Sequence, residues 1–183
     1  MDTESKLLKI LIEKTNSKDI SSMANKLESN SKFNLKSDIE KLKGIWELRW
    51  SSSNAPFLSY SPLVDNLQIL NPSKSNAMNL LKPRGINGII GTGIVAELYP
   101  INEIRVGVQF THAGLIGPNI RFTKLKSLFQ IKKEQKGWLD ITYLSDNLRI
   151  CRGDKGTLFT LVRRNNEKLF TKFEEFMKNV QLI

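Results

Sequence analysis

Apolar positions near the N-terminus recur at helical spacing. Leu7, Leu8 and Leu11 fall on one face of a helix predicted over residues 3–14. Beyond a polar break at 16–19, a second set follows the spacing i, i+3, i+4, i+7: Ile20, Met23, Ala24 and Leu27. The pattern predicts two short amphipathic helices that pack against the rest of the chain. A lipid-surface anchor is the alternative, although the charges of these helices are mixed in sign.

Alternation of period two then predicts a first strand from Ile45 to Trp50. Trp46, Leu48 and Trp50 share one face, which we expect to point inward. Residues 51–62 are rich in serine and proline and predict a loop. The apolar residues of this loop form contacts at the mouth of a barrel, form a lip that touches lipid, or fold back onto the core: Phe57, Leu58 and Tyr60.

Short apolar runs at 67–70 and 78–81 precede a glycine-punctuated run over 86–98. We interpret the glycines as bends within strands: Gly85, Gly88, Gly91 and Gly93. They do not form a phosphate loop of the P-loop type, because no Gly-Lys-Ser/Thr ending and no strand–loop–helix context accompanies them.

Residues 103–111 alternate well and predict another strand. Residues 113–119 contain two glycines and a proline, which predict a loop. A further strand is expected over 120–131, with a bulge or break near Lys126 where the alternation changes phase.

Three β-prone runs lie between Trp138 and Arg164. Short turns at 145–147 and 153–156 separate them, and this arrangement is typical of an antiparallel meander. After Asn165 a continuous apolar stripe predicts a C-terminal helix that packs on the sheet, with a membrane-facing helix as the alternative: Leu169, Phe170, Phe173, Phe176, Met177 and Val180.

Two segments carry a resemblance to a known family. Residues 42–52 read Leu-Lys-Gly-Ile-Trp-Glu-Leu-Arg-Trp-Ser-Ser, and residues 143–161 contain Tyr-Leu-x-Asp-x-Leu-Arg-Ile-x-Arg-Gly-Asp-x-Gly-x-Leu-Phe-x-Leu. They resemble the first-strand motif and the C-terminal signature of the fibrillins, the plastid lipid-associated proteins of chloroplasts and cyanobacteria. Trp50 and Ser51 replace the tyrosine and threonine of the family pattern. The motif residues are Gly44, Arg149, Arg152, Gly153, Asp154 and Gly156.

The resemblance, together with the strand pattern, implies a mainly β fold: a lipocalin-like (calycin-type) antiparallel barrel with two short N-terminal helices and one C-terminal helix. We expect a single domain, with a helical segment over 1–43 packed on a barrel and C-terminal helix over 44–183. The family resemblance implies binding or carriage of isoprenoid lipids such as quinones or carotenoids, association with thylakoids or lipid globules, and photoprotection. Large aromatic residues are predicted to line or close the ligand cavity: Trp46, Trp50, Phe110, Phe129 and Tyr143.

The net charge of +10 lies mostly in the β-rich part of the chain. The densest basic surface is predicted over 121–136: Arg121, Lys124, Lys126, Lys132, Lys133 and Lys136. Such a surface favours anionic partners, namely an anionic membrane surface or an acidic protein, or else it is a solvated face without a specific ligand. Nucleic acid is not expected, because aromatic residues are not interleaved with these basic residues.

The N-terminus lacks the basic and apolar regions of a secretory signal, and its acidic residues are unlike those of a transit peptide. No apolar run is long enough to span a bilayer, and a single cysteine, Cys151, fits a reducing compartment. We therefore expect a cyanobacterial-type member that is cytoplasmic and peripheral to the thylakoid membrane, or a plastid protein trimmed of its transit peptide.

Candidate catalytic groups are sparse. His112 and Cys151 have no metal-ligand spacing between them, so neither a metal nor a cofactor is expected. Asp140, Asp146 and Asp154 would suit a glycosidase, but two of them fall in turns, where aspartate is common for backbone reasons. We predict that the chain is not an enzyme.

Arg152 shares a strand face with Leu148 and Ile150, where an unpaired charge would be costly. It should therefore pair with a carboxylate or reach the polar head of a ligand. The alternative function is a basic interaction module that docks an acidic partner or an anionic membrane surface without an internal ligand. The oligomeric state is left open.

Overall fold

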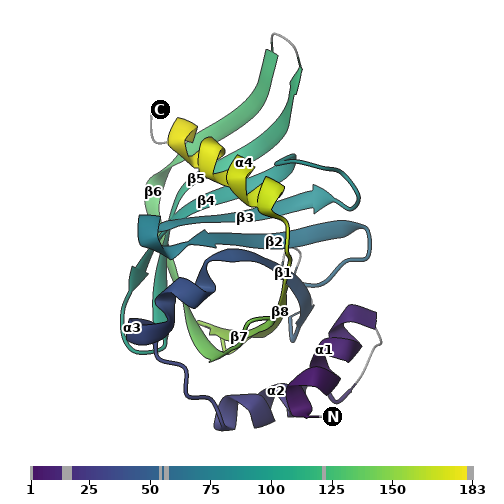
Figure 1. Ribbon diagram of the computed structural model, residues 1–183. Coiled ribbons are helices and arrows are strands. Elements are labelled where there is room, and N and C mark those ends of the chain that lie inside the picture. Colours follow the sequence, from purple (N-terminus) through teal and green to yellow (C-terminus); the bar gives the residue numbers. More distant parts are fainter. Residues whose placement is uncertain (1, 14–17, 54, 56–57, 121–122, 181–183) are drawn as a thin grey trace.

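Eight antiparallel strands form a closed ring in the computed structural model, which describes residues 2–13, 18–53, 55, 58–120 and 123–180. The ring follows chain order from β1 to β8, and β8 pairs with β1 to complete it (Figure 1). The elements are α1 Thr3–Glu13, α2 Ile20–Ser29, α3 Leu35–Asp38, η1 Ile39–Leu42, β1 Gly44–Ser51, β2 Val64–Asn71, η2 Pro72–Lys74, β3 Asn76–Pro83, β4 Gly91–Pro100, β5 Arg105–Ile120, β6 Thr123–Leu144, β7 Leu148–Gly153, β8 Leu158–Arg163 and α4 Glu167–Val180. The predicted mainly β, antiparallel fold is confirmed.

The connections between strands alternate between two ends of the ring, because neighbouring strands run in opposite directions. At one end, the α3 end, α3 and η1 precede β1, and the turns at 72–75, 101–104 and 145–147 lie there. At the other, the loop end, lie the connections 52–63, 84–90 and 154–157, together with the tip of the β5–β6 hairpin.

Apolar side chains gather in three clusters, one inside the ring and two between the ring and its helices. The lumen cluster is formed by Leu35, Leu42, Trp46, Leu48, Leu70, Ala77, Ala96, Val106, Ile141, Cys151 and Leu161. Helix α4 packs Leu169, Phe173 and Met177 against the outside of β1–β5, as its apolar stripe predicts. Helices α1 and α2 cover the outside of β7 and β8, where Leu148 and Ile150 are fully buried.

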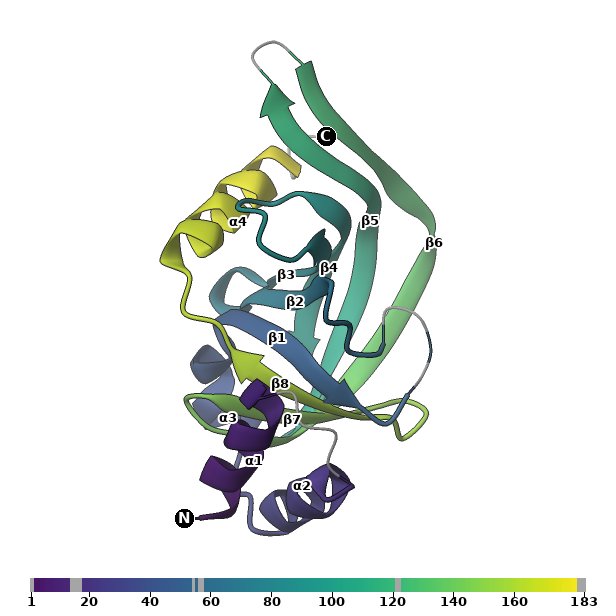
Figure 2. The same cartoon turned by 90° about the vertical axis from the view of Figure 1, so that its right-hand side faces the viewer.

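The strands of the ring differ greatly in length. Strand β6 has 22 residues and β5 has 16, whereas β7 and β8 have 6 each. Strand β6 pairs with β7 only over 139–144, so in the described chain its residues 123–138 pair with β5 alone. Figure 2 shows β5 and β6 rising beyond the other strands. We call this projecting part of the hairpin the β5–β6 arm.

The loop predicted over 113–119 is wrong, because β5 continues to Ile120. Glycine and proline favour a turn locally, but β5 has no β4 partner beyond Ile116. Pro118 therefore lies where the strand has one free edge, the position at which a sheet tolerates a residue without an N–H donor. The two strands predicted at 120–131 and from 138 are likewise one strand, β6.

Of two detailed predictions about the strands, one is confirmed and one holds only in part. The irregularity expected near Lys126 is confirmed, since the β5–β6 register shifts between Ile116 and Asn119, which pair with Lys126 and Lys124. The glycines, by contrast, do not all lie within a strand. Gly85 and Gly88 occupy the 84–90 loop with φ of +84° and +105°, which favour glycine.

Candidate functional site

The α3 end of the lumen is sealed around Trp46. The indole Nε1 donates to Leu42 O at 2.9 Å, which ties the first strand to η1. The Arg163 guanidinium lies 4.1 Å from the centre of the Trp46 ring and donates to Lys41 O and Lys43 O, both at 2.7 Å. A Cβ atom on Gly44 would stand 2.6 Å from Arg163 Nη1, so the glycine of the first-strand motif leaves room for this contact.

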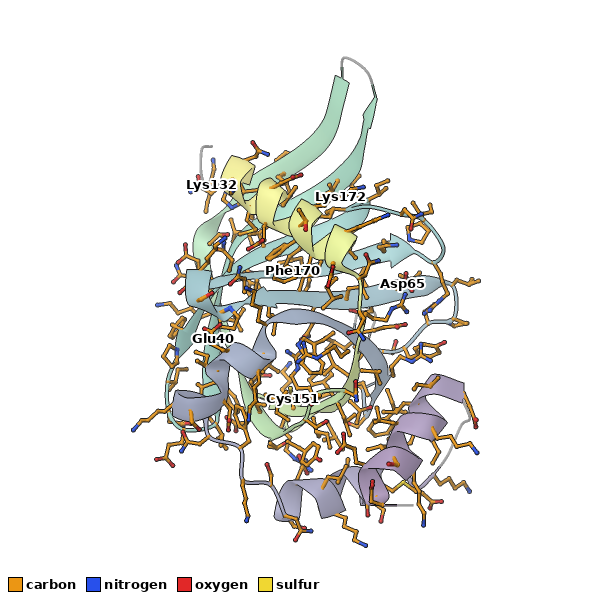
Figure 3. The ribbon with its side chains drawn as sticks, viewed as in Figure 1. Glu40, Asp65, Lys132, Cys151, Phe170 and Lys172 are labelled. Atoms are coloured by element: carbon orange, nitrogen blue, oxygen red, sulfur yellow. The ribbon has the colours of Figure 1, made fainter. Side chains whose placement is uncertain are left out.

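Arg149 is a buried cation on the lumen side of the ring. It pairs with Leu161 across the β7–β8 ladder and shares its strand face with Cys151, and both neighbours belong to the lumen cluster. Figure 3 labels Cys151, which lies on β7 two residues after Arg149. The guanidinium lies 5.1 Å from the centre of the Trp46 ring, and Nη2 donates to Gln68 Oε1.

The charge of Arg149 is not balanced by a carboxylate within the described part of the chain. The residue is only 2% exposed, and its Nε has no hydrogen-bond partner. Burial lowers the pKa of the Arg149 guanidinium, because the charged form is poorly solvated there. An unpaired buried charge with a spare donor is unfavourable by itself and suits an oxygen-bearing group brought by a ligand.

The lumen face remains accessible toward the loop end. The register of β3, β4 and β5 places Asn79, Ile94 and Ala113 in one row, on the faces that alternate with residues packed on α4. Asn79 is exposed although it lies on this inner face. The row continues on the β5–β6 arm, where Leu115 is 64% and Phe129 is 69% exposed. We call these five residues the loop-end wall.

The structure brings two of the predicted ligand residues together in the lumen. Trp46 belongs to the lumen cluster, and Phe110 packs against it. Phe129 lies on the lumen-facing side of the β5–β6 arm, but it does not close a cavity, because the arm has no β7 neighbour there.

The prediction that Trp50 and Tyr143 line the lumen is wrong. Both pack outside the ring with the cluster under α1 and α2, and the Tyr143 hydroxyl donates to Glu4 Oε2 at 2.8 Å. The reason is a pair of register shifts, one between Leu48 and Trp50 and one between Ile141 and Tyr143. Each inserts one residue and turns the following side chain to the opposite face.

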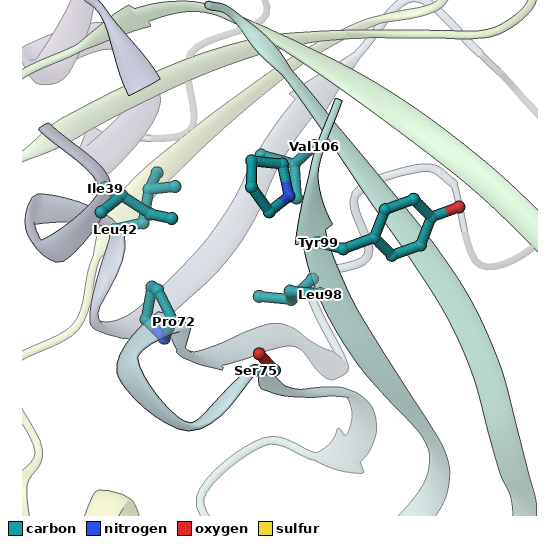
Figure 4. Close-up of a pocket in the computed structure, with 8 residues that line it drawn as sticks. Ile39, Leu42, Pro72, Ser75, Leu98, Tyr99 and Val106 are labelled. Atoms are coloured by element: carbon teal, nitrogen blue, oxygen red, sulfur yellow. The ribbon is translucent and has the colours of Figure 1, made fainter. Parts of the chain in front are cut away.

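A small apolar cavity of about 40 Å³ lies at the α3 end, between η1 and the ends of β4 and β5 (Figure 4). Its lining includes Leu42, Leu98 and Val106. The volume suits one or two small groups and not an isoprenoid chain.

The motif residues of β7 and its turn have separate positions. Arg152 points to α2, where it donates to Glu28 Oε1 at 2.9 Å and to Glu28 Oε2 at 2.6 Å, so the expected carboxylate partner is present. Gly156 has φ of +71° and its N–H donates to Gly153 O, which forms the tight turn before β8. Asp154 is exposed in this turn.

The predicted basic surface is only partly within the described residues. Lys132 and Lys136 are exposed on β6. The side chains of Lys124, Lys126 and Lys133 lie outside the described part, as does all of Arg121. The surface therefore stays a prediction.

The candidate catalytic groups are not brought together. Asp140 forms a bidentate pair with Arg105, at 2.6 and 2.9 Å, while Asp146 and Asp154 are exposed at opposite ends of the ring. His112 contacts Thr111, and Cys151 is buried in the lumen cluster. Among the described residues, no group of three or more histidine, cysteine or carboxylate side chains is placed to hold a metal ion.

The resemblance placed Arg149 in the C-terminal motif, but the sequence did not show that it lies in the lumen without a carboxylate partner among the described residues. The sequence did indicate that Arg149 and Cys151 share one face of the strand, because they alternate with Leu148 and Ile150. Both faces of β7 are buried, however, one in the lumen and one beneath α1 and α2. The alternation alone could not distinguish them.

Comparisons with known proteins agree with the two motifs. No curated protein and no solved structure matches the chain. None of the described helices is long and apolar enough to cross a membrane. The family model PAP_fibrillin matches residues 8–162, a span that includes the ring of strands and both motifs. The chain therefore belongs to the PAP_fibrillin family of plastid lipid-associated proteins.

Proposed function

We propose that this protein binds one lipophilic molecule in the lumen of its ring, without catalysis. The observation that carries the proposal is the loop-end wall, where Leu115 and Phe129 face the lumen side and remain largely exposed. Large apolar side chains exposed side by side mark an interaction site more often than chance exposure. An apolar ligand would cover them.

The α3 end of the lumen contains polar side chains that can bind the polar group of such a ligand. Arg149 and Gln68 lie among apolar side chains near Trp46, and Arg149 retains a donor without a partner. Ligand sites of this kind combine an apolar lining with a few polar groups that fix orientation. We place the oxygen-bearing head of an isoprenoid lipid, such as a quinone or an oxygenated carotenoid, toward Arg149 and its chain along the loop-end wall.

The proposal extends to location and role. Family membership supports lipid association, and we place the protein at the surface of thylakoids or lipid globules, where the carried isoprenoid would support photoprotection. Exposed apolar residues of two connections lie at the same loop end as the wall: Leu58, Leu63 and Ile86. They suit contact with a lipid surface. We also propose that the closed ring is a lipocalin-like barrel, which holds its ligand inside the ring of strands.

The test is native mass spectrometry of the full chain after incubation with a mixture of plastoquinone and carotenoids. We expect a bound lipophile in a one-to-one complex. The double variant Leu115→Glu/Phe129→Glu should retain at least about tenfold less, because two charges replace the apolar contacts of the ligand. Both side chains are exposed, so we expect the fold to persist, and thermal unfolding will check it.

Ile101→Glu is the matched control, since Ile101 is 50% exposed in the connection at the α3 end. It should retain the lipophile like the unmodified chain. Equal retention by the control and the double variant, or no retention by the unmodified chain, would contradict the proposal.

A second candidate rests on the exposure of Lys132 and Lys136 on β6. Here the protein would dock an acidic partner or an anionic membrane through its basic surface, with no internal ligand. Lys132→Glu/Lys136→Glu separates the two candidates. It should abolish such docking and leave lipophile retention unchanged.

A further inference from the structure

A group of ionic side chains lies on the outer face of β1–β3, away from the lumen. Glu47 is 2% exposed and contacts Arg49 and Arg84 at 3.0 Å and Arg164 at 2.6 Å. Asp65 contacts Arg84 at 3.1 Å and Lys82 at 3.5 Å. We call these six residues the outer ionic cluster.

The outer ionic cluster carries more positive than negative charge. Its four cations face two carboxylates, and both carboxylates are already shared between cations. Lys82 and Arg49 have side chains only 7% exposed, so water solvates their charges poorly. These two buried cations equal the two buried carboxylates in number, so the excess of positive charge lies on Arg84 and Arg164, whose side chains are 27% and 43% exposed and can meet an anion from solvent.

A polar cavity of about 90 Å³ adjoins this cluster. It is lined by Asp65, Lys82 and Arg164, by the 85–88 loop, and by Asn166 and Leu169 at the start of α4. Figure 3 shows Asp65 and, from α4, Lys172 on this flank of the molecule. Lys172 Nζ lies 3.9 Å from the point where a Cβ atom would stand on Gly88, which brings a further cation to the loop.

The cations around the cavity keep donors for a ligand. Arg164 uses Nη1 for Glu47, out of the five N–H donors of a guanidinium. Lys82 Nζ donates to Ile86 O and lies near Asp65, which leaves one of its three donors.

We infer that this cavity binds the phosphate group of an anionic ligand. Lys82 and Arg164 line it from β3 and from the segment after β8, and Lys172 of α4 lies beside Gly88 in its loop, so three elements bring cations to it. The Asp65 carboxylate, which also lines the cavity, is already paired with Lys82 and Arg84. The volume accommodates a phosphate group, but not an acyl or isoprenoid chain. The ligand is inorganic phosphate or the phosphomonoester headgroup of a lipid.

The apolar residues around the cavity are compatible with a phosphate group that belongs to a lipid. Ile86, which lines the cavity, is 42% exposed, and Leu63 is 78% exposed. Arg84 N donates to Leu63 O at 3.0 Å, so the two loops that carry these side chains are joined. A chain attached to the bound phosphate would leave the cavity past this apolar edge. The site lies outside the lumen and does not require the lipophile proposed above.

The first experiment titrates inorganic phosphate into the full chain by calorimetry, against chloride at equal ionic strength. We expect saturable binding of one phosphate. Lys172→Gln and Arg164→Gln should each weaken it about tenfold, because each removes one charge-assisted hydrogen bond. Lys178→Gln on the same helix is the matched control and should change the affinity less than about twofold, since it makes the same change of charge away from the cavity.

The second experiment measures sedimentation with phosphatidylcholine vesicles, with and without phosphatidic acid. Binding that requires phosphatidic acid and is lost in Lys172→Gln, but not in Lys178→Gln, identifies a lipid headgroup as the ligand. Saturable binding of phosphate alone identifies the free anion.

The inference fails if neither probe binds, or if Lys172→Gln and Lys178→Gln behave alike in both experiments. Lys172 is exposed, so its substitution leaves the fold intact. Failure here is separable from failure of the proposed function. A chain that retains quinone but binds neither phosphate nor phosphatidic acid refutes only the anion site.

Discussion

Arg149 stands among apolar side chains with a positive charge that no described carboxylate balances. A buried cation of this kind contributes little to the stability of the fold, since replacement by apolar residues of similar volume often increases the free energy of unfolding. Its presence at the α3 end of the lumen is better explained by a ligand than by packing.

Arg149→Met should therefore stabilise the protein without ligand, by about 1–4 kcal/mol in the free energy of unfolding. The same variant should lose retention of an oxygen-bearing lipophile. Chemical denaturation and native mass spectrometry measure the two effects.

Arg152→Met provides the contrast on the same strand. Arg152 has Glu28 as a bidentate partner, so its loss should destabilise the protein by about 1 kcal/mol. If both variants are destabilised alike, Arg149 is a structural residue and its assignment to the ligand is wrong.

Single residues also show which inward-facing positions could be predicted from the sequence and which could not. The alternation in β1 placed Trp46 and Leu48 correctly, and the resemblance motif located Gly44 beside them. One inserted residue, Arg49, then turned Trp50 away from the lumen, and Thr142 did the same to Tyr143. A bulge leaves no hydrophobic signature when both faces of a strand are buried, so period-two counting cannot detect it.

At the scale of elements, α1 is attached to the ring through a polar contact as well as apolar packing. Tyr143 OH and Ser145 Oγ both donate to Glu4, the acidic residue in the first turn of α1. Leu7 and Leu11 of the same helix are buried against the ring. The contact links the titration of Tyr143 to the docking of this helix.

Burial, together with the hydrogen bond to Glu4, raises the pKa of Tyr143 to about 12 from an ordinary value of 10.0. A raised pKa in the folded state means that this contact contributes fully below pH 10 and is lost as the pH rises toward 12. We expect one tyrosine to ionise late in an absorbance titration, together with a loss of protection of α1 against hydrogen exchange relative to the intrinsic rate at the same pH.

Tyr143→Phe is the control for that titration. It should remove the late step, and the protection of α1 against hydrogen exchange, relative to the base-catalysed intrinsic rate, should no longer change between pH 10 and 12. A late step that survives in this variant would belong to another tyrosine.

Elements were predicted with uneven success, and the physical reasons differ. Both N-terminal helices, α4 and the meander have strong local periodicity, and the structure contains them. Strand β5 was cut short in the prediction because Gly117 and Pro118 resemble a turn, and β6 was divided at the polar residues between 131 and 138. Pairing across the β5–β6 arm, where Ile116 lies opposite Lys126 and Asn119 opposite Lys124, overrides that local preference.

At the scale of the whole molecule, the net charge of +10 and the apolar lumen should act separately. Attraction of a basic protein to an anionic vesicle acts through water and is screened over about 10 Å at 0.1 M salt and about 3 Å at 1 M. Capture of a lipophile in an apolar site is not weakened in this way.

Raising the salt concentration from 0.1 to 1 M should therefore reduce association with anionic vesicles by at least about tenfold and leave retention of a preloaded lipophile unchanged. Stopped-flow light scattering measures the first quantity and native mass spectrometry after buffer exchange measures the second. Loss of the lipophile at high salt would show that charge, and not apolar contact, holds it.

The short strands β7 and β8 have a further consequence for the long β6. Over residues 123–138, β6 presents backbone N–H and C=O groups on an edge that no described strand covers. Such an edge is a template for self-association between copies of a protein. The register breaks where residues 131–134 lie between the partners of Phe110 and His112, and exposed lysines lie within this irregularity, at Lys132, and just after it, at Lys136. We expect this interruption of the ladder to disfavour continuous pairing between the edges of two copies.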